Sequence, residues 1–256
     1  MDTRRKRNIF CLPFAGGSSY HYREFQKFTA GSTHIFPVEL PGRGKRFSEP
    51  LLTNIHEMVE DVLGQIAPVL DKPYTIYGHS LGAKLGYLLT KRIIGGNLPE
   101  PLHLFVSGSE GPSSEPRERN RHLLPSGKFK ALLNRFEGTP AEVLENSELM
   151  DFFEPIIRAD FQAVDTYVYE YSEPFDIPVT VMIGRDDRLT AEGVMKWQDI
   201  TTRRISVREF PGGHFFVFKH LPELGKIFSE GCFHSGTHAE EDDRDILHAF
   251  QVKASR

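Results

Sequence analysis

The strongest chemical signal in the sequence is a serine between two glycines. Residues 78–82 read Gly-His-Ser-Leu-Gly. This Gly-x-Ser-x-Gly pattern is typical of a sharp turn between a strand and a helix, which exposes the serine Oγ above a sheet. An apolar run at 74–77 precedes the turn, and an apolar helical pattern begins near Leu81. We therefore predict that Ser80 is a nucleophile, next to the N–H groups and the positive dipole end of a helix.

A serine nucleophile needs a base, and the sequence offers one late in the chain. Residues 211–215 read Pro-Gly-Gly-His-Phe and follow a predicted strand. We predict that His214 is the base, because it completes the chain order serine, acid, histidine. His79 is the alternative, but its place inside the turn favours a role in supporting Ser80.

The acid that orients the histidine should follow a strand between these two points. Asp186 and Asp187 come directly after the buried-type strand 179–184. One carboxylate should accept the Nδ1–H of His214 and stabilise the imidazolium that forms during attack. Adjacent side chains point in different directions, so we expect only one of them to do this. We favour Asp187 and keep Asp186 as the alternative.

Two backbone amides should form an oxyanion hole. The residue after the nucleophile, Leu81, supplies one N–H, and an early loop supplies the other. Residues 13–18 read Pro-Phe-Ala-Gly-Gly-Ser and follow the first predicted strand, so Ala15 or Phe14 is the expected second donor. This loop lacks the spacing of a nucleotide-binding fingerprint, and no metal-ligand spacing surrounds His214. We predict that no metal and no cofactor is needed.

These residues require a sheet and helices that hold them together. Short β-rich runs alternate with longer helical patterns, which indicates an α/β fold with a mostly parallel sheet. The predicted helices cover 55–70 and 81–94, and the predicted strands cover 9–12, 34–39, 74–77, 102–107, 179–183 and 205–210.

The alternation of strands and helices stops between residues 108 and 176. After a polar stretch, helices are predicted at 129–136, 141–153 and 155–171. Because substrate pockets form at the loop end of such sheets, we interpret this insertion as a helical lid. We expect one domain over 1–232, followed by a polar, mobile tail over 233–256.

Composition excludes several classes of protein. The chain has 256 residues, with 31 basic and 35 acidic side chains and a net charge of −4. It is 39% hydrophobic and 26% charged, which excludes general disorder. No apolar run approaches the ~20 residues of a membrane helix, and no basic face indicates nucleic acid. Two cysteines, Cys11 and Cys232, make no disulfide framework. We expect a cytoplasmic monomer.

Taken together, five segments resemble one family, the type II thioesterases. These are free-standing α/β-hydrolases that accompany nonribosomal peptide and polyketide synthases, with relatives that release medium-chain fatty acids from fatty acid synthase. The resemblance covers about residues 9–228. The segments, in order, are Pro-Phe-Ala-Gly-Gly at 13–17, Leu-Pro-Gly-Arg-Gly at 40–44, Gly-His-Ser-Leu-Gly at 78–82, Ile-Ile-Arg-Ala-Asp at 156–160 and Pro-Gly-Gly-His-Phe at 211–215.

The resemblance implies an activity as well as a fold. It implies Ser80 as nucleophile, His214 as base, Asp187 as acid, and Ala15 and Leu81 as oxyanion donors. It further implies a helical lid. The substrate would be an acyl group on the phosphopantetheine arm of an acyl or peptidyl carrier protein, removed when a synthase is stalled or misprimed. The alternatives are a medium-chain fatty acyl thioesterase, a small-molecule carboxylesterase, an acyltransferase or cyclase, and an inactive binding module.

Other residues in and near these segments allow more than one role. Arg158 and Asp160 lie two apart on a predicted helix and so do not share a face. They could fasten the lid to the body or line a surface for a carrier protein, and we favour a structural role. Arg43 could shape its turn or meet the pantetheine phosphate, and we favour the turn. The phenylalanines of the lid could line an acyl channel or simply form its core: Phe129, Phe136, Phe152, Phe153 and Phe161.

Overall fold

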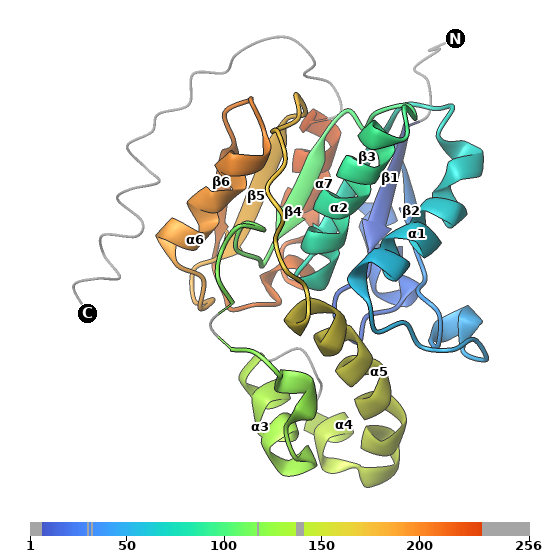
Figure 1. Cartoon of the computed structure of the whole chain (residues 1–256), viewed down its shortest axis with the longest axis vertical. Coiled ribbons are helices and arrows are strands. Elements are labelled where there is room, and N and C mark those ends of the chain that lie inside the picture. Colours follow the sequence, from blue (N-terminus) through green and yellow to red (C-terminus); the bar gives the residue numbers. More distant parts are fainter. Residues whose placement is uncertain (1–6, 30, 32, 117, 137–140, 232–256) are drawn as a thin grey trace.

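A six-stranded, fully parallel sheet forms the centre of the molecule (Figure 1). The computed structural model describes residues 7–29, 31, 33–116, 118–136 and 141–231. The tail predicted at 233–256 lies outside the described residues. The strand order is β2-β1-β3-β4-β5-β6, and the strands are β1 (Arg7–Leu12), β2 (Thr33–Pro37), β3 (Tyr74–His79), β4 (Leu104–Ser107), β5 (Val179–Gly184) and β6 (Ser206–Phe210). The predicted α/β class and all six predicted strands are confirmed.

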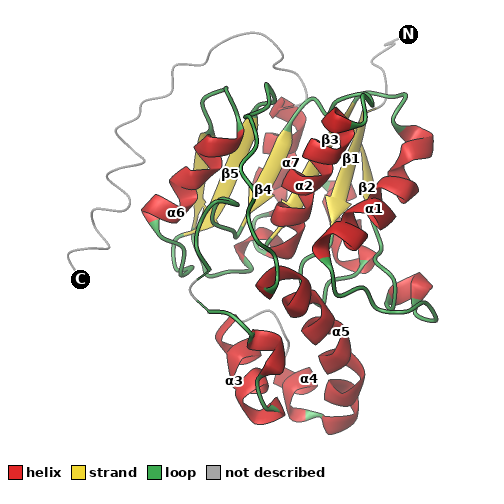
Figure 2. Ribbon diagram, in the orientation of Figure 1, coloured by secondary structure: helices red, strands yellow, loops and turns green. Residues whose placement is uncertain are grey.

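Both faces of the sheet are covered by helices, as Figure 2 shows. Alternate residues of β1 face opposite sides, so Phe10 and Leu12 join one hydrophobic cluster while Ile9 and Cys11 join another. The first cluster includes residues of α1 (Ile55–Ile66), α2 (Leu81–Gly95) and the segment 191–200; the second includes residues of α7 (Leu221–Gly231) and of the 3-10 segment Ser19–Lys27. A core on each face makes the sheet a rigid support for the loops at its ends.

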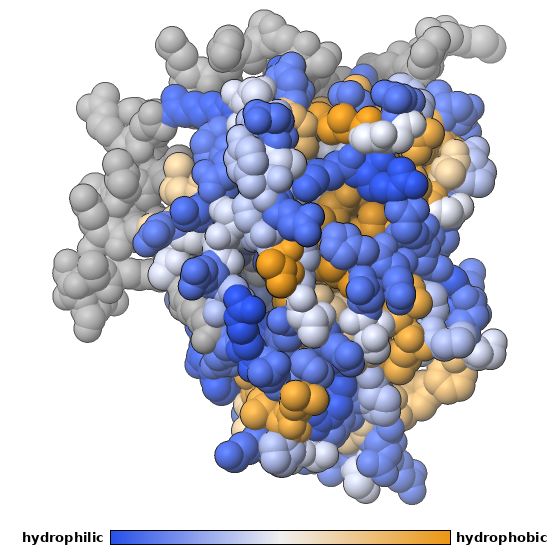
Figure 3. Space-filling view, in the orientation of Figure 1, coloured by the Kyte–Doolittle hydropathy of each residue, from blue (hydrophilic) through white to orange (hydrophobic). Residues whose placement is uncertain are grey.

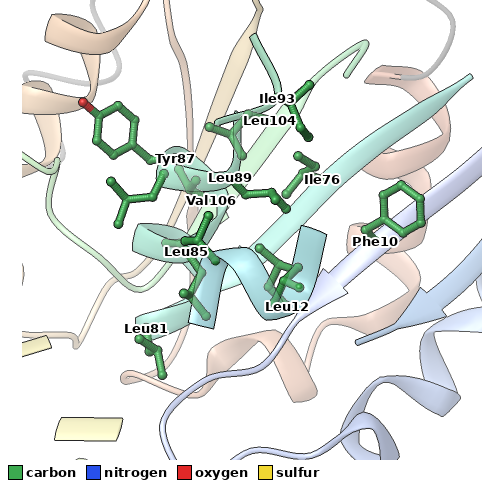
Figure 4. Packing of buried hydrophobic residues seen from close by; sticks show 14 of the residues in the cluster. Phe10, Leu12, Ile76, Leu81, Leu85, Tyr87, Leu89, Ile93, Leu104 and Val106 are labelled. Carbon is green, nitrogen blue, oxygen red and sulfur yellow. The ribbon is translucent and has the colours of Figure 1, made fainter. Parts of the chain in front are cut away.

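Helix α2 follows the Ser80 turn directly and packs into the core. Its buried side chains include Leu81, Leu85 and Leu89, one helical turn apart. Figure 4 shows them beside residues of β1, β3 and β4. Because i and i+4 positions lie on one face of a helix, this apolar stripe fixes the orientation of α2 on the sheet.

Between β4 and β5 the chain forms a helical insertion. It consists of α3 (Ser126–Phe136), α4 (Ala141–Glu145) and α5 (Ser147–Asp165), and Figure 1 shows it at one end of the sheet. The predicted boundary between one helix ending at 153 and the next beginning at 155 is wrong, because α4 ends at Glu145 and α5 runs through Pro155. A proline inside a helix removes one backbone hydrogen bond. Here Pro155 is exposed, while Ile156 and Ile157 beside it are buried, so packing outweighs the loss.

The remaining elements are short. They are α6 (Ala191–Met195) and the 3-10 segments Gly44–Arg46, Ala67–Val69, Arg121–Leu123, Lys196–Ile200 and Phe216–Phe218. The face shown in Figure 3 is mainly hydrophilic, with hydrophobic side chains in small groups, one of them over the helical insertion. Among the helices of the described residues, none is long and apolar enough to span a membrane.

Candidate active site

Ser80 lies on a strained turn between β3 and α2. Its φ of 57° and ψ of −113° are unusual for a residue with a side chain. The turn is held by the Ser80 amide, which donates to the Ser107 carbonyl oxygen at 2.8 Å. A Cβ at Gly78 would overlap the carbonyl oxygen of Gly82, and a Cβ at Gly82 would lie 2.6 Å from the Leu12 carbonyl oxygen. Only glycine fits at these two positions, which explains the spacing of the motif.

His214 and Asp187 form a hydrogen-bonded pair on the neighbouring loops. His214 Nδ1 lies 2.9 Å from Asp187 Oδ2, and both side chains are nearly buried, with 9% and 5% of their area exposed. The rival acid, Asp186, is exposed, and its amide donates to the Gly212 carbonyl oxygen. The turn after β5 therefore directs Asp187, and not Asp186, toward the histidine. With Nδ1–H donated to this carboxylate, the Nε2 lone pair is left to accept a proton.

His79, the alternative base, is fully buried behind the turn. Its Nδ1 lies 2.9 Å from Ser107 Oγ, and Ser107 Oγ also lies 3.0 Å from the Tyr77 hydroxyl. Burial lowers the pKa of His79 well below its usual value, and the nearby His214 adds to this. A neutral His79, 4.9 Å from the ring of His214, leaves that ring free to gain a proton without a like charge beside it.

The two predicted oxyanion amides lie at the start of α2 and in the loop after β1. Leu81 is the first residue of α2, and Ala15 lies in the loop that follows β1. Within the part of the chain that the structure describes, neither amide donates to a protein acceptor. The next amide in the loop, that of Gly16, is occupied, because it donates to Asp160 Oδ2 at 2.7 Å.

One cavity joins these groups. It has a volume of about 520 Å³, within the usual range for a small-molecule site. The helical insertion supplies part of its wall, and the ring of Phe136 lies 5.2 Å from the ring of His214. The lining on the body side includes Phe14, Ala15, Ser80, Leu81, Asp187 and His214, and the lining from the insertion includes Leu133, Phe136, Ile157 and Phe161.

Comparisons with known proteins decide the family. Residues 7–231 match the family model described as the thioesterase domain. The chain belongs to the thioesterase family. It is 35% identical over 225 residues to the gramicidin S biosynthesis protein GrsT of Aneurinibacillus migulanus, covering 88% of each chain. It is 28% identical over 216 residues to the medium-chain S-acyl fatty acid synthase thioesterase of Rattus norvegicus, covering 82% of this chain and 81% of that one.

A solved structure agrees with this assignment. ClbQ from the colibactin NRPS/PKS pathway superimposes with a TM-score of 0.84 at 30% identity, covering 88% of this chain and 96% of that one. The resemblance to type II thioesterases and the predicted α/β-hydrolase fold are both confirmed. The protein is a thioesterase.

In this thioesterase a buried ion pair ties the helical insertion to the body. Asp160 of α5 is fully buried and accepts two hydrogen bonds from Arg43, at 2.6 and 2.8 Å. Arg43 follows β2 and is only 3% exposed, so it does not meet a phosphate at the surface. Asp160 Oδ2 also accepts the amide of Gly16, next to Ala15. One carboxylate thus connects α5, the loop after β2 and the loop after β1.

Arg158 and the five phenylalanines of the insertion lie in different parts of it. Arg158 stays within the insertion, where it binds Glu154 and the His122 carbonyl oxygen and covers the ring of Phe129. Of the five phenylalanines, Phe136 and Phe161 line the cavity and Phe129 is in the core of the insertion. Phe153 packs against that core. The exposed Phe152 stacks on Phe47 of the body, with ring centroids 5.1 Å apart.

Lys84 is the lining residue that sequence reasoning missed. It follows Ser80 by four positions on α2 and lines the cavity. Its pKa is lowered to about 8, mainly by burial and in smaller part by the guanidinium of Arg121, while Glu110 acts in the opposite direction. A signal was present, since Lys84 is the one charged residue between positions 81 and 90.

Proposed function

We propose that this thioesterase is a serine hydrolase that removes acyl groups from the phosphopantetheine arm of carrier proteins. The observation that carries the proposal is the cavity in which Ser80, His214 and Asp187 lie together under a helical insertion. Relatives from gramicidin S and colibactin biosynthesis support a synthase carrier protein as the partner. The role would be editing, the removal of stalled or wrongly primed acyl units.

The geometry suggests how the reaction proceeds. Ser80 Oγ attacks the thioester carbonyl carbon while His214 Nε2 takes its proton, and Asp187 stabilises the imidazolium. The amides of Ala15 and Leu81 stabilise the tetrahedral oxyanion. The imidazolium of His214 then gives this proton to the sulfur as the carbon–sulfur bond breaks, so that pantetheine leaves as a thiol and His214 is neutral again.

Hydrolysis of the acyl-enzyme completes the cycle. His214 takes a proton from water, whose oxygen attacks the acyl carbon on Ser80. The imidazolium then returns that proton to Ser80 Oγ as the ester bond breaks and the free acid departs. The walls that Phe136 and Phe161 contribute limit the water around this intermediate.

The medium-chain fatty acyl thioesterases are the second candidate, favoured by the likeness to the rat enzyme. The two candidates share the chemistry and differ in acyl chain and synthase. The cavity has room for more than a two-carbon acyl group, so its size leaves both candidates in place.

The test is the intact mass of an acetyl-loaded carrier protein after incubation with the enzyme. We expect loss of the acetyl mass with the native enzyme and no loss with Ser80→Ala. A carrier that stays loaded while a simple ester is cleaved quickly would contradict the proposal and indicate a small-molecule carboxylesterase. A decanoyl-loaded carrier, cleaved much faster than the acetyl form, would favour the fatty acyl candidate.

A further inference from the structure

The acyl cavity contains a cation close to the nucleophile. Lys84 comes four residues after Ser80 at the start of α2, so their backbones are separated by about 6 Å along the helix axis. Both residues line the same cavity. The exposed part of Lys84 therefore lies at this cavity. The acyl chain of a substrate bound at Ser80 would occupy the same cavity.

The charge on Lys84 lacks the partners that other charged groups of the cavity have. Within the described residues, its ammonium makes no hydrogen bond or ion pair, and its ring contact is Tyr167, 5.8 Å away. The other charged groups away from the rim are held by protein partners: Glu110 by Thr190, Arg121 by Asp165 and Asp187 by His214. The Glu118–Arg135 pair is exposed and belongs to the rim. At the rim lie the exposed residues Glu115, Arg119 and Arg188.

An ammonium in such a place disfavours some substrates and favours others. Burial lowers the pKa of Lys84 to about 8, so the group is still mostly protonated at neutral pH. An alkyl chain that fills the cavity would remove water from the ammonium without supplying a hydrogen-bond acceptor or a counter-charge. A carboxylate on the acyl chain would supply both a counter-charge and a hydrogen-bond acceptor.

We propose that Lys84 selects acyl chains that carry a carboxylate, so that the preferred substrates are half-thioesters of dicarboxylic acids. This inference rests on the proposed function and names its substrate class. Lys84 is a specificity residue, since it binds the far end of the acyl group and takes no part in proton transfer at Ser80.

The test compares acyl groups of equal length with and without a carboxylate. Glutaryl and valeryl thioesters of N-acetylcysteamine form one pair, and adipyl and hexanoyl thioesters form another; thiol release gives kcat/KM. A charge-assisted hydrogen bond in a partly buried site is worth about 10- to 100-fold, so we expect the native enzyme to prefer the carboxylate member of at least one pair by that factor. Lys84→Met should reverse the preference.

A matched control tests whether removing a different positive charge from the same helix also changes the preference for a carboxylate. Lys91 lies on the same helix, contacts the ring of Tyr87 and does not line the cavity. Lys91→Met should keep the native preference. Lys84→Gln is the second variant, and it should lose the preference for the carboxylate even if Lys84→Met does not fold.

Binding to an inactive variant separates this inference from the proposed function. In Ser80→Ala, calorimetry should show that the glutaryl or adipyl thioester of N-acetylcysteamine binds at least tenfold more tightly than the valeryl or hexanoyl thioester. Equal binding, or a native enzyme that prefers the alkyl thioesters, overturns the role of Lys84. Failure to deacylate any loaded carrier protein, with the carboxylate preference intact in binding, overturns the proposed function alone.

Discussion

Replacing Asp160 by asparagine removes the charge that faces Arg43 and keeps the shape of the side chain. Asp160 is fully buried, and the Arg43 side chain is 4% exposed, so solvent cannot replace the lost partner. Removing one member of a buried ion pair costs about 3–5 kcal/mol, because the other charge stays buried alone. At roughly 2–4 °C per kcal/mol for a chain of this size, Tm should fall by about 6–20 °C.

The assay is urea unfolding of Asp160→Asn, Arg43→Gln and the double variant. The double variant should be less destabilised than the sum of the two single ones, with a coupling free energy of about 1–3 kcal/mol. Glu60→Gln is the matched control, because the Glu60–Arg92 pair is exposed and an exposed ion pair contributes little to stability. If Asp160→Asn costs no more than Glu60→Gln, the assignment of this ion pair as the anchor of α5 is wrong.

Activity adds a readout that a merely structural pair would not change. Asp160 holds the Gly16 amide, so its loss should displace the neighbouring Ala15 amide from the oxyanion position. We expect Asp160→Asn to lower kcat more than it raises KM, measured well below its reduced Tm. An unchanged kcat in the folded variant would show that Asp160 does not position this loop.

Three further perturbations follow from the site. Asp187→Asn should lower kcat by about 10⁴-fold by disturbing the tautomer of His214, while Asp186→Asn should change it less than threefold; equal losses in steady-state assays would contradict the assignment of Asp187. Because the pKa of Lys84 is lowered from 10.5 to about 8, the unfolded chain binds the extra proton between these values, so stability should rise with pH by up to about 3 kcal/mol there. The free energy of unfolding of Lys84→Met, measured with urea, should not rise over this pH range. If it rises as much as that of the native protein, Lys84 is not the source of the rise. Ser107→Ala leaves His79 Nδ1 unpaired and should cost about 1–3 kcal/mol in urea unfolding, and a cost near zero would show that the contact does not support the turn.

The local features of the fold were predictable from sequence. The strands next to the nucleophile turn are short apolar runs, and the turn itself requires glycine at positions 78 and 82. Each of these features depends on a few residues that are neighbours in the sequence. The alternation of strands and helices then led to a parallel sheet, because parallel strands need helical connections. Pro155 was misread because its local effect opposes the packing of distant side chains around α5.

Features that depend on distant contacts were not predictable. Arg43 and Asp160 are 117 positions apart, and no pattern in either segment reveals that they meet. The choice between Asp186 and Asp187 depends on the turn after β5 and stayed open in the sequence. The sequence shows Lys84 as a lone charge on an apolar helix, but only the structure shows that it lines the cavity.

The central claim is that Ser80 performs the removal of acyl groups from carrier proteins. Stepwise labelling with a fluorophosphonate, followed by peptide mass spectrometry and a carrier deacylation assay on the same samples, tests it most directly. We expect the label on Ser80, and carrier deacylation that falls in proportion and reaches zero at one label per chain. Deacylation that continues when Ser80 is fully labelled, or a label on another residue that abolishes it, would contradict the account.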